Sequence, residues 1–170
     1  MKTVVFFGYS GSGKTRAIVS VAKELVKKGN KVGTIKHIHD EDFTMDTKGK
    51  DTWLHASAGA SVIVALAPNE LTTIEKKDTR NMTIDELLRI FRSKGVDYLV
   101  IEGLYRKLSK SHDIVPILCA KSSEDAVALL GLHPRPVCIL HRNPGGARYL
   151  RGVPLLRLPK DLGRLLELIG

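Results

Sequence analysis

The feature that most constrains this chain is an eight-residue stretch near its start, Gly8–Thr15, which reads GYSGSGKT. It matches the pattern G-x-x-x-x-G-K-[ST], the P-loop motif, whose backbone wraps around the phosphates of a nucleotide. The apolar run Thr3–Gly8 comes directly before it and indicates a buried strand. The residues that follow, Lys14–Lys28, have apolar side chains every three to four positions and predict a helix. A strand, a glycine-rich loop and a helix in this order predict a P-loop nucleotide-binding fold.

The residue types within Gly8–Thr15 suit a phosphate ligand. The glycines let the backbone curve closely, so that several N–H groups point at phosphate oxygens. We expect Lys14 to reach the β- and γ-phosphates and the Thr15 hydroxyl to bind Mg²⁺. The predicted nucleotide-binding residues of the loop are Gly8, Ser10, Gly11, Ser12, Gly13, Lys14 and Thr15.

A P-loop also needs an acid that holds Mg²⁺ or orders its water. The apolar run Tyr98–Glu102 ends on a carboxylate, which is the position of a Walker B acid, whereas Ser61–Ala67 ends without one. The carboxyl edge of a parallel sheet is where ligands bind in open α/β folds. Glu102 is therefore the expected acid. The alternative is that Glu102, at the end of its strand, only pairs with a nearby lysine.

Short apolar runs alternate with amphipathic segments along the chain. The predicted strands are Thr3–Gly8, Val32–His37, Ser61–Ala67, Leu71–Glu75, Tyr98–Glu102, Asp113–Cys119, Pro136–His141 and Pro154–Leu158. The predicted helices are Lys14–Lys28, Asp51–Ala58, one from Thr83 to Gly95, one from Ser122 that Gly131 closes, and one striped by Leu162, Leu165, Leu166 and Ile169. This alternation predicts a three-layer α/β fold of the P-loop NTPase type, a mostly parallel sheet with helices on both faces. With 170 residues, 43% of them apolar, we expect a single nucleotide-binding domain over 1–170.

The polar stretch His39–Lys50 predicts a loop in which a carboxylate can face the γ-phosphate and its Mg²⁺. Two histidines, His37 and His39, stand at its start. Three interpretations of them remain open: a contact with phosphate or a partner, a solvated loop, and a transition-metal site.

The chain carries 27 Lys and Arg against 18 Asp and Glu, a net charge of +9 that favours a polyanionic partner. Six basic residues and no acidic residue lie between Ala126 and Lys160. A nucleic-acid-binding module is one interpretation, but aromatic residues make up only 5% and form no nucleic-acid-reading motif, so we expect no such partner. Cys119 and Cys138 lie in apolar runs and are expected to be small buried residues of a cytoplasmic protein without a membrane partner.

Several motifs occur together with the P-loop: Val32–His39 (VGTIKHIH), Asp46–Asp51 with its D-x-x-G-K-D pattern, Ala58–Ala60 (AGA), and Glu102 followed by glycine. In this order and spacing they resemble the molybdopterin-guanine dinucleotide biosynthesis protein B family, over residues 1 to about 105. The resemblance implies a GTP-binding protein with weak GTPase activity that assists the guanylylation of molybdopterin in molybdenum or tungsten cofactor biosynthesis. It also implies Mg²⁺ as cofactor and a homodimer, with molybdopterin or molybdopterin guanine dinucleotide and the guanylyltransferase of the same pathway as partners.

The resemblance further assigns roles to residues. It implies that Asp46 is the carboxylate near the γ-phosphate and that Glu102 is the Walker B acid. The expected catalytic residues are then Lys14, Asp46 and Glu102, the expected metal ligands are Thr15, Asp46 and Glu102, and Lys36 and His37 join the nucleotide-binding set. The assignment of GTP as the nucleotide rests on the resemblance alone, because the chain has no Asn-Lys-x-Asp motif for reading guanine. Asn143 stands where a base-reading loop can lie.

A P-loop small-molecule kinase is the alternative function. The loop 142–151 contains Arg142, Arg148 and Arg151 among glycines and a proline, and arginines on such a loop can close as a lid over a transferring phosphoryl group. A solvated basic loop fits the same residues. For the basic carboxyl-terminal surface as a whole, a pyrophosphorylated pterin, an acidic partner and solvent all remain candidates.

Overall fold

The computed structural model describes residues 1–108, 113–132, 135–143 and 145–170. The chain forms two compact units, one made of Met1–His37 with Ile84–Gly170 and the other of Ile38–Thr83. That the two act as one nucleotide-binding domain stays a prediction. Among the described residues, no helix has the length and apolar character needed to cross a membrane.

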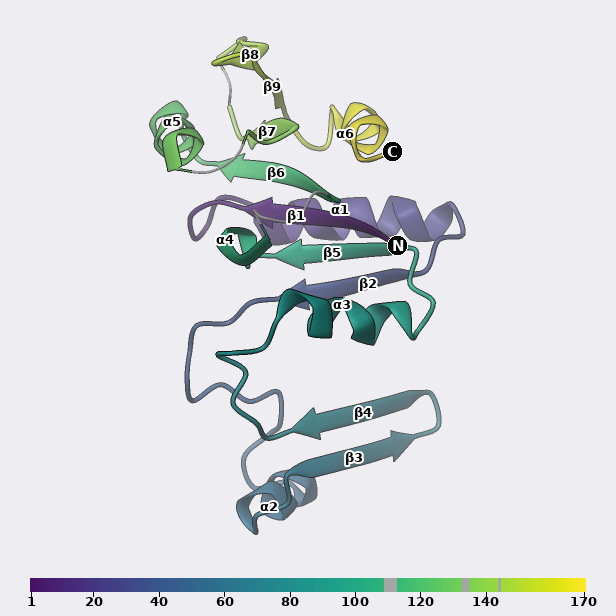
Figure 1. Cartoon of the computed structure of the whole chain (residues 1–170). Coiled ribbons are helices and arrows are strands. Elements are labelled where there is room, and N and C mark those ends of the chain that lie inside the picture. Colours follow the sequence, from purple (N-terminus) through teal and green to yellow (C-terminus); the bar gives the residue numbers. More distant parts are fainter. Residues whose placement is uncertain (109–112, 133–134, 144) are drawn as a thin grey trace. The chain divides into compact units, whose positions relative to one another are not determined.

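The first unit is built on a seven-stranded sheet with the order β2-β5-β1-β6-β7-β9-β8 (Figure 1). Its strands are β1 (Lys2–Phe7), β2 (Val32–Lys36), β5 (Tyr98–Glu102), β6 (Ile114–Ala120), β7 (Cys138–His141), β8 (Tyr149–Leu150) and β9 (Val153–Leu156). Neighbouring strands run parallel, apart from the antiparallel pair β8 and β9. The predicted mostly parallel sheet is therefore confirmed.

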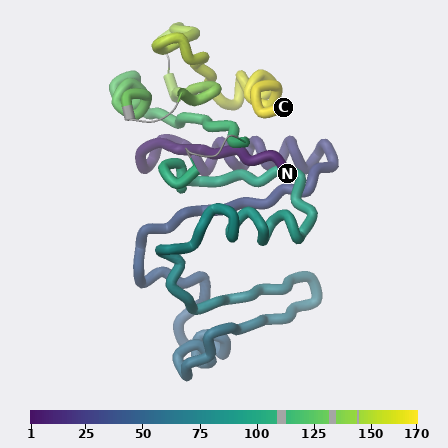
Figure 2. Tube along the Cα trace, in the orientation of Figure 1, coloured from purple at the N-terminus to yellow at the C-terminus, as the bar shows by residue number. Residues whose placement is uncertain are grey.

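Helices cover both faces of this sheet, as the sequence predicts (Figure 1). Residues of β1 alternate between the faces: Val4 and Phe6 pack with α1 (Lys14–Lys27) and α6 (Leu162–Ile169). Val5 and Phe7 pack on the other face with α3 (Ile84–Arg92), α4 (Tyr105–Leu108) and α5 (Ser123–Leu132). Figure 2 shows α6 ending near the start of β1, where the Lys2 ammonium donates to the Gly170 carbonyl at 3.1 Å.

The second unit contains a short helix, α2 (Asp51–Ser57), and a separate two-stranded sheet of β3 (Val62–Ala67) and β4 (Glu70–Glu75). These two strands pair antiparallel, with Ala67 opposite Glu70. A connection of two residues can only form a hairpin, since a parallel pair needs a long crossover. The predicted strands exist here, but they lie outside the parallel sheet.

The structure departs from the sequence prediction in three further places. The prediction that Gly131 closes a helix was wrong, because α5 runs on to Leu132 and Gly131 does not take the positive φ of a terminating glycine. The predicted loop 143–152 contains β8, and its residue Pro144 lies outside the described residues. The single-turn helix α4 has too few residues to show a periodic pattern. Cys119 and Cys138, in contrast, are buried as predicted.

Candidate functional site

The loop between β1 and α1 has the P-loop conformation because glycines occupy its tightest points. Gly8 has a φ of 142°, and a Cβ at this position would lie 2.0 Å from the carbonyl oxygen of Cys119 on β6. Only glycine fits there without moving the backbone. Gly13 has a φ of 94° and forms the N-cap of α1. The loop is thereby held against the carboxyl end of the neighbouring strand.

The groups that would meet phosphate surround this loop. The Lys14 ammonium donates to the carbonyl oxygens of Gly8 at 3.0 Å and Tyr9 at 2.8 Å, so it lies across the loop. The Ala17 N–H donates to the Gly13 carbonyl at 3.0 Å, whereas in the described part of the chain the preceding N–H groups of the first turn have no carbonyl acceptor. Ser12 Oγ is buried and also lacks a partner among the described residues. These donors and the helix dipole form an anion-binding cradle.

Thr15 and Glu102 meet at the edge of this cradle. The Thr15 hydroxyl, in the first turn of α1, donates to Glu102 Oε2 at 3.2 Å. Glu102 is the last residue of β5 and pairs in register with Phe6 of β1. Two of the three side chains predicted to bind Mg²⁺, Thr15 and Glu102, therefore lie within hydrogen-bonding distance of each other.

The end of β2 joins the same edge. Lys36 lies opposite Glu102 in the parallel ladder, and the His37 N–H donates to the Glu102 carbonyl at 3.0 Å. The following residue, Gly103, has a φ of 87° and donates its N–H to the Phe6 carbonyl at 3.1 Å. The predicted residues Lys36 and His37 are thus beside Glu102, at the carboxyl edge that carries the P-loop.

Oxygen donors of this kind suit Mg²⁺, which prefers carboxylate, hydroxyl and phosphate oxygens. The described residues contain no group of three or more His, Cys, Asp or Glu side chains placed to hold a metal ion. The transition-metal interpretation of His37 and His39 thus receives no support from the described residues.

Asp46 belongs to the second unit. Its Oδ1 accepts hydrogen bonds from the Thr47 N–H at 2.8 Å and from the Thr52 hydroxyl at 2.9 Å, which ties the loop to α2. Its Oδ2 is buried and has no partner among the described residues. This second oxygen is available to a ligand, but the predicted role of Asp46 at the γ-phosphate stays a prediction.

Two cations beside the P-loop are absent from the predicted set of nucleotide-binding residues. Arg142, directly after β7, donates from Nη2 to the Gly11 carbonyl at 3.3 Å. The Nζ of Lys121, directly after β6, lies 3.7 Å from where a Cβ on Gly11 would be. Each stands one residue beyond the carboxyl end of a parallel strand, which the sequence suggests, but their approach to Gly11 depends on the order of the strands in the sheet.

Two arginines of the proposed kinase lid, Arg142 and Arg151, lie at opposite edges of the sheet. Arg142 contacts the P-loop, but Arg151 lies in the turn between β8 and β9, at the amino-terminal end of β9. Because β9 is parallel to β7 and β1, that end is at the opposite edge of the sheet from the P-loop. Asn143 lies near the P-loop edge, where its Oδ1 accepts the Gly145 N–H at 3.4 Å; base reading by Asn143 stays a prediction.

The fold and this site define a nucleotide-binding protein of the P-loop class. The model of one family, described as molybdopterin guanine dinucleotide synthesis protein B, matches residues 3–128. The chain belongs to this family, which confirms the resemblance seen in its motifs.

Relatives and solved structures agree with this assignment. The chain is 34% identical over 96 residues to the molybdopterin-guanine dinucleotide biosynthesis adapter protein of Haemophilus influenzae, covering 56% of this chain and 53% of the relative. It is 30% identical over 133 residues to a putative adapter protein of the same name from Methanocaldococcus jannaschii. This match covers 78% of this chain and 53% of the relative. The chain spans about half the length of the curated relatives it matches.

The crystal structure of Bacillus subtilis MobB superposes with a TM-score of 0.79 at 22% identity, over 100% of this chain and 99% of that one. The crystal structure of a MobB homologue from Bacillus stearothermophilus superposes with a TM-score of 0.72 at 19% identity, over 99% of this chain and 98% of that one. At these identities the structures establish the fold, and they confirm the predicted α/β P-loop architecture.

Proposed function

We propose that this protein binds GTP with Mg²⁺ at the P-loop and hydrolyses it slowly. The observation that carries the proposal is the Thr15–Glu102 contact of 3.2 Å at the mouth of an anion-binding cradle. A hydroxyl and a carboxylate so placed would supply two oxygens of an octahedral magnesium site, and phosphate and water oxygens would supply the others. The Ser12 Oγ, which is buried and has no partner among the described residues, supports a ligand at the same place.

Each residue of the site has a physical role in this proposal. Thr15 and Glu102 hold Mg²⁺, which neutralises charge that develops on the phosphates. Lys14 leaves its two carbonyl acceptors and pairs with the β- and γ-phosphates. The amides of the first turn of α1 bind phosphate oxygens. Glu102 also orders a water molecule for attack, and Asp46 adds a second carboxylate near the γ-phosphate.

We infer the biological role from the family. Relatives are named adapter proteins of molybdopterin-guanine dinucleotide biosynthesis. By extension, this chain assists the transfer of a guanylyl group onto molybdopterin, during molybdenum or tungsten cofactor biosynthesis in the cytoplasm. Its partners are then molybdopterin or molybdopterin guanine dinucleotide and the guanylyltransferase of the pathway.

We further propose a homodimer, which the hairpin of β3 and β4 supports. One face of this hairpin exposes four aliphatic side chains, Val62, Val64, Leu66 and Leu71, at 53–84% of their surface. Leu66 lies opposite Leu71 in the register, so the apolar strip is continuous. An exposed strip of this kind is characteristic of an interface.

Light scattering tests the homodimer. Leu66→Lys should convert the dimer to a monomer, while Val26→Lys, at an exposed position of α1, should not. A monomeric wild-type protein would contradict the proposal.

Calorimetry tests the nucleotide assignment directly. Titrations with Mg-GTP, Mg-ATP and GTP plus a chelator should give the tightest binding with Mg-GTP. Slow release of inorganic phosphate without any acceptor should accompany it. Phosphate transfer only when an acceptor is added would instead establish the alternative, a small-molecule kinase.

A further inference from the structure

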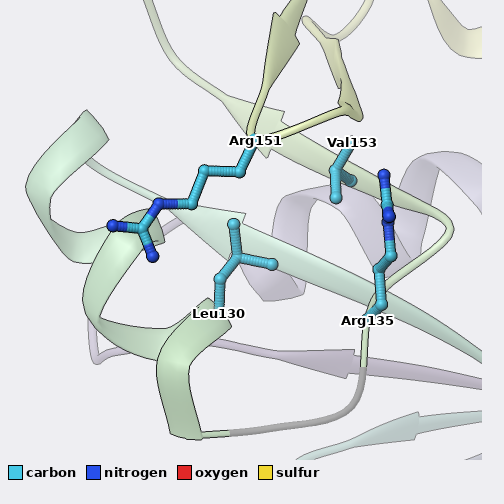
Figure 3. A pocket seen from close by; sticks show the side chains of 4 residues that line it. All are labelled: Leu130, Arg135, Arg151 and Val153. Carbon is cyan, nitrogen blue, oxygen red and sulfur yellow. The ribbon is translucent and has the colours of Figure 1, made fainter.

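Two pairs of basic side chains lie at opposite edges of the parallel sheet. At the edge away from the P-loop, Arg135 and Arg151 line a pocket, but their guanidinium groups lie on opposite sides of it and point apart (Figure 3). At the carboxyl edge, Lys121 follows β6 and Arg142 follows β7, and both approach Gly11 of the P-loop. Of these two pairs, the second converges on one residue.

The chain leaves β1 and β6 toward opposite faces of the sheet. The helix after β1, α1, packs on one face, whereas the helix after β6, α5, packs on the other. The two strands are parallel neighbours, so their carboxyl ends lie side by side. In open α/β sheets, ligands bind at the carboxyl edge where the connections diverge in this way. A ligand held by the loop after β1 therefore lies beside the carboxyl end of β6 as well.

The two sides of β1 offer a nucleotide different contacts. In the proposed function, Thr15 and Glu102 hold Mg²⁺ near the β- and γ-phosphates on the side of β5. The strands β6 and β7 lie on the other side of β1. Because the nucleoside is at the opposite end of the phosphate chain from the γ-phosphate, it would then extend toward β6 and β7.

The Arg142 guanidinium is fixed on this side of the P-loop. Its Nη2 donates to the Gly11 carbonyl at 3.3 Å. The turn that carries it is held by His141, a buried residue whose Nδ1 accepts the Asn143 N–H at 3.1 Å. Arg142 itself is exposed, and the described residues give it no other hydrogen bond or ion pair. Four N–H donors and the flat face of the guanidinium are thus left for a ligand.

We propose that Arg142 is a specificity-determining residue that contacts the nucleoside, so that the protein binds a nucleotide more tightly than a bare polyphosphate. This inference rests on the proposed nucleotide site. A guanidinium group stacks on aromatic rings such as a nucleobase, and its N–H groups can donate to ribose oxygens. Lys121, which approaches the same glycine, has a compact ammonium and supplies charge without a flat face.

Calorimetry with Mg-GTP and with Mg-tripolyphosphate tests the proposal, because tripolyphosphate has the phosphate chain but no nucleoside. In Arg142→Ala, the affinity for Mg-GTP should fall at least tenfold. The affinity for Mg-tripolyphosphate should fall less than threefold, since it loses only a salt-screened charge, and this retained binding also shows that the variant is folded. Equal losses for the two ligands, or no loss for Mg-GTP, would overturn the proposal.

Two further variants serve as controls. Lys121→Ala removes a charge beside the same glycine, so it should weaken the binding of both ligands by the same factor. Lys14→Ala should weaken both at least tenfold, which reports on the phosphate cradle itself. If Lys14→Ala changed neither affinity, the proposed function would fail, and this inference with it. If Lys14→Ala behaves as expected but Arg142→Ala resembles Lys121→Ala, only the role of Arg142 fails.

Discussion

The Thr15 hydroxyl and the Glu102 carboxylate lie 3.2 Å apart although 87 residues separate them in the chain. Thr15 is the last residue of the P-loop motif and lies in the first turn of α1, and Glu102 ends β5. The parallel ladder between β1 and β5 places these two chain segments at the same edge of the sheet. The backbones of the two residues are therefore placed side by side by the core of the fold.

Removal of the Lys14 ammonium should weaken triphosphate binding at least tenfold. In Lys14→Ala the charge that pairs with the β- and γ-phosphates is lost, while the loop glycines keep the backbone in place. Calorimetry with Mg-GTP measures the loss. Lys28→Ala, at the other end of α1, is the matched control and should bind normally; unchanged affinity in Lys14→Ala would refute the site assignment.

Glu102→Gln should lower hydrolysis more than binding. A carboxylate that acts on Mg²⁺ or on the attacking water matters most in the transition state, so kcat should fall at least tenfold while the affinity for Mg-GTP changes less. Phosphate release under single-turnover conditions, compared with calorimetry, separates the two. Glu124→Gln, on α5, serves as control. Equal losses in rate and affinity would indicate a structural role for Glu102.

Gly8→Ala should destabilise the protein by about 3 kcal/mol or more, because the added Cβ overlaps the Cys119 carbonyl and the chain cannot relax without moving β6. Gly29→Ala is a matched control: Gly29 also has a positive φ, 84°, but a Cβ there meets nothing within 4 Å. Its cost should be about 1 kcal/mol, from the backbone alone. Urea unfolding of both variants measures the difference, and similar values would contradict the packing described for the P-loop.

High pH should unfold the protein through its buried thiols and phenol. Burial raises the pKa of Cys119 and Cys138 from 9.0 to about 12, and raises that of Tyr105 from 10.0 to about 12. A raised pKa means that the folded state holds the proton more tightly. The associated stability is complete below the unfolded values and is lost as the pH rises toward about 12.

Urea unfolding at pH values from about 7 to about 11 should thus show a falling free energy of unfolding above about pH 9. The cysteines should react with a thiol reagent only in unfolded protein, since thiolates are the reactive form. Rapid labelling of both thiols in the native protein at about pH 8 would contradict their burial.

The sequence predicted the parallel core closely because its signals are local. The apolar run of β5 and its terminal acid define Tyr98–Glu102 without reference to the rest of the chain, and the bounds in the structure are the same. The sequence predicted β3 and β4 as two strands. It did not predict that they pair with each other, because this pairing depends on the two-residue connection between them. The two-residue strand β8 has no periodic signal and forms only because a positive-φ turn folds it onto β9.

The site was predictable where one motif or one strand end determines it, as for Lys14, Thr15 and Glu102. Lys121 was not predicted as a binding residue, and Arg142 was predicted only as part of a kinase lid, since their approach to Gly11 depends on the order of β6 and β7 in the sheet. That order arises from long-range pairing, which no local pattern encodes. Asp46 was predicted from family resemblance, and its contacts tie it to α2.

The central claim is that Thr15 and Glu102 hold a magnesium ion against a bound triphosphate. Calorimetric titration of GTP with and without Mg²⁺, in the wild-type protein and in Thr15→Ala, tests it most directly. Mg²⁺ should strengthen GTP binding at least tenfold in the wild-type protein and less than twofold in Thr15→Ala. Equal dependence on Mg²⁺ in the two proteins, or none in the wild type, would contradict the assignment of this pair as the metal site.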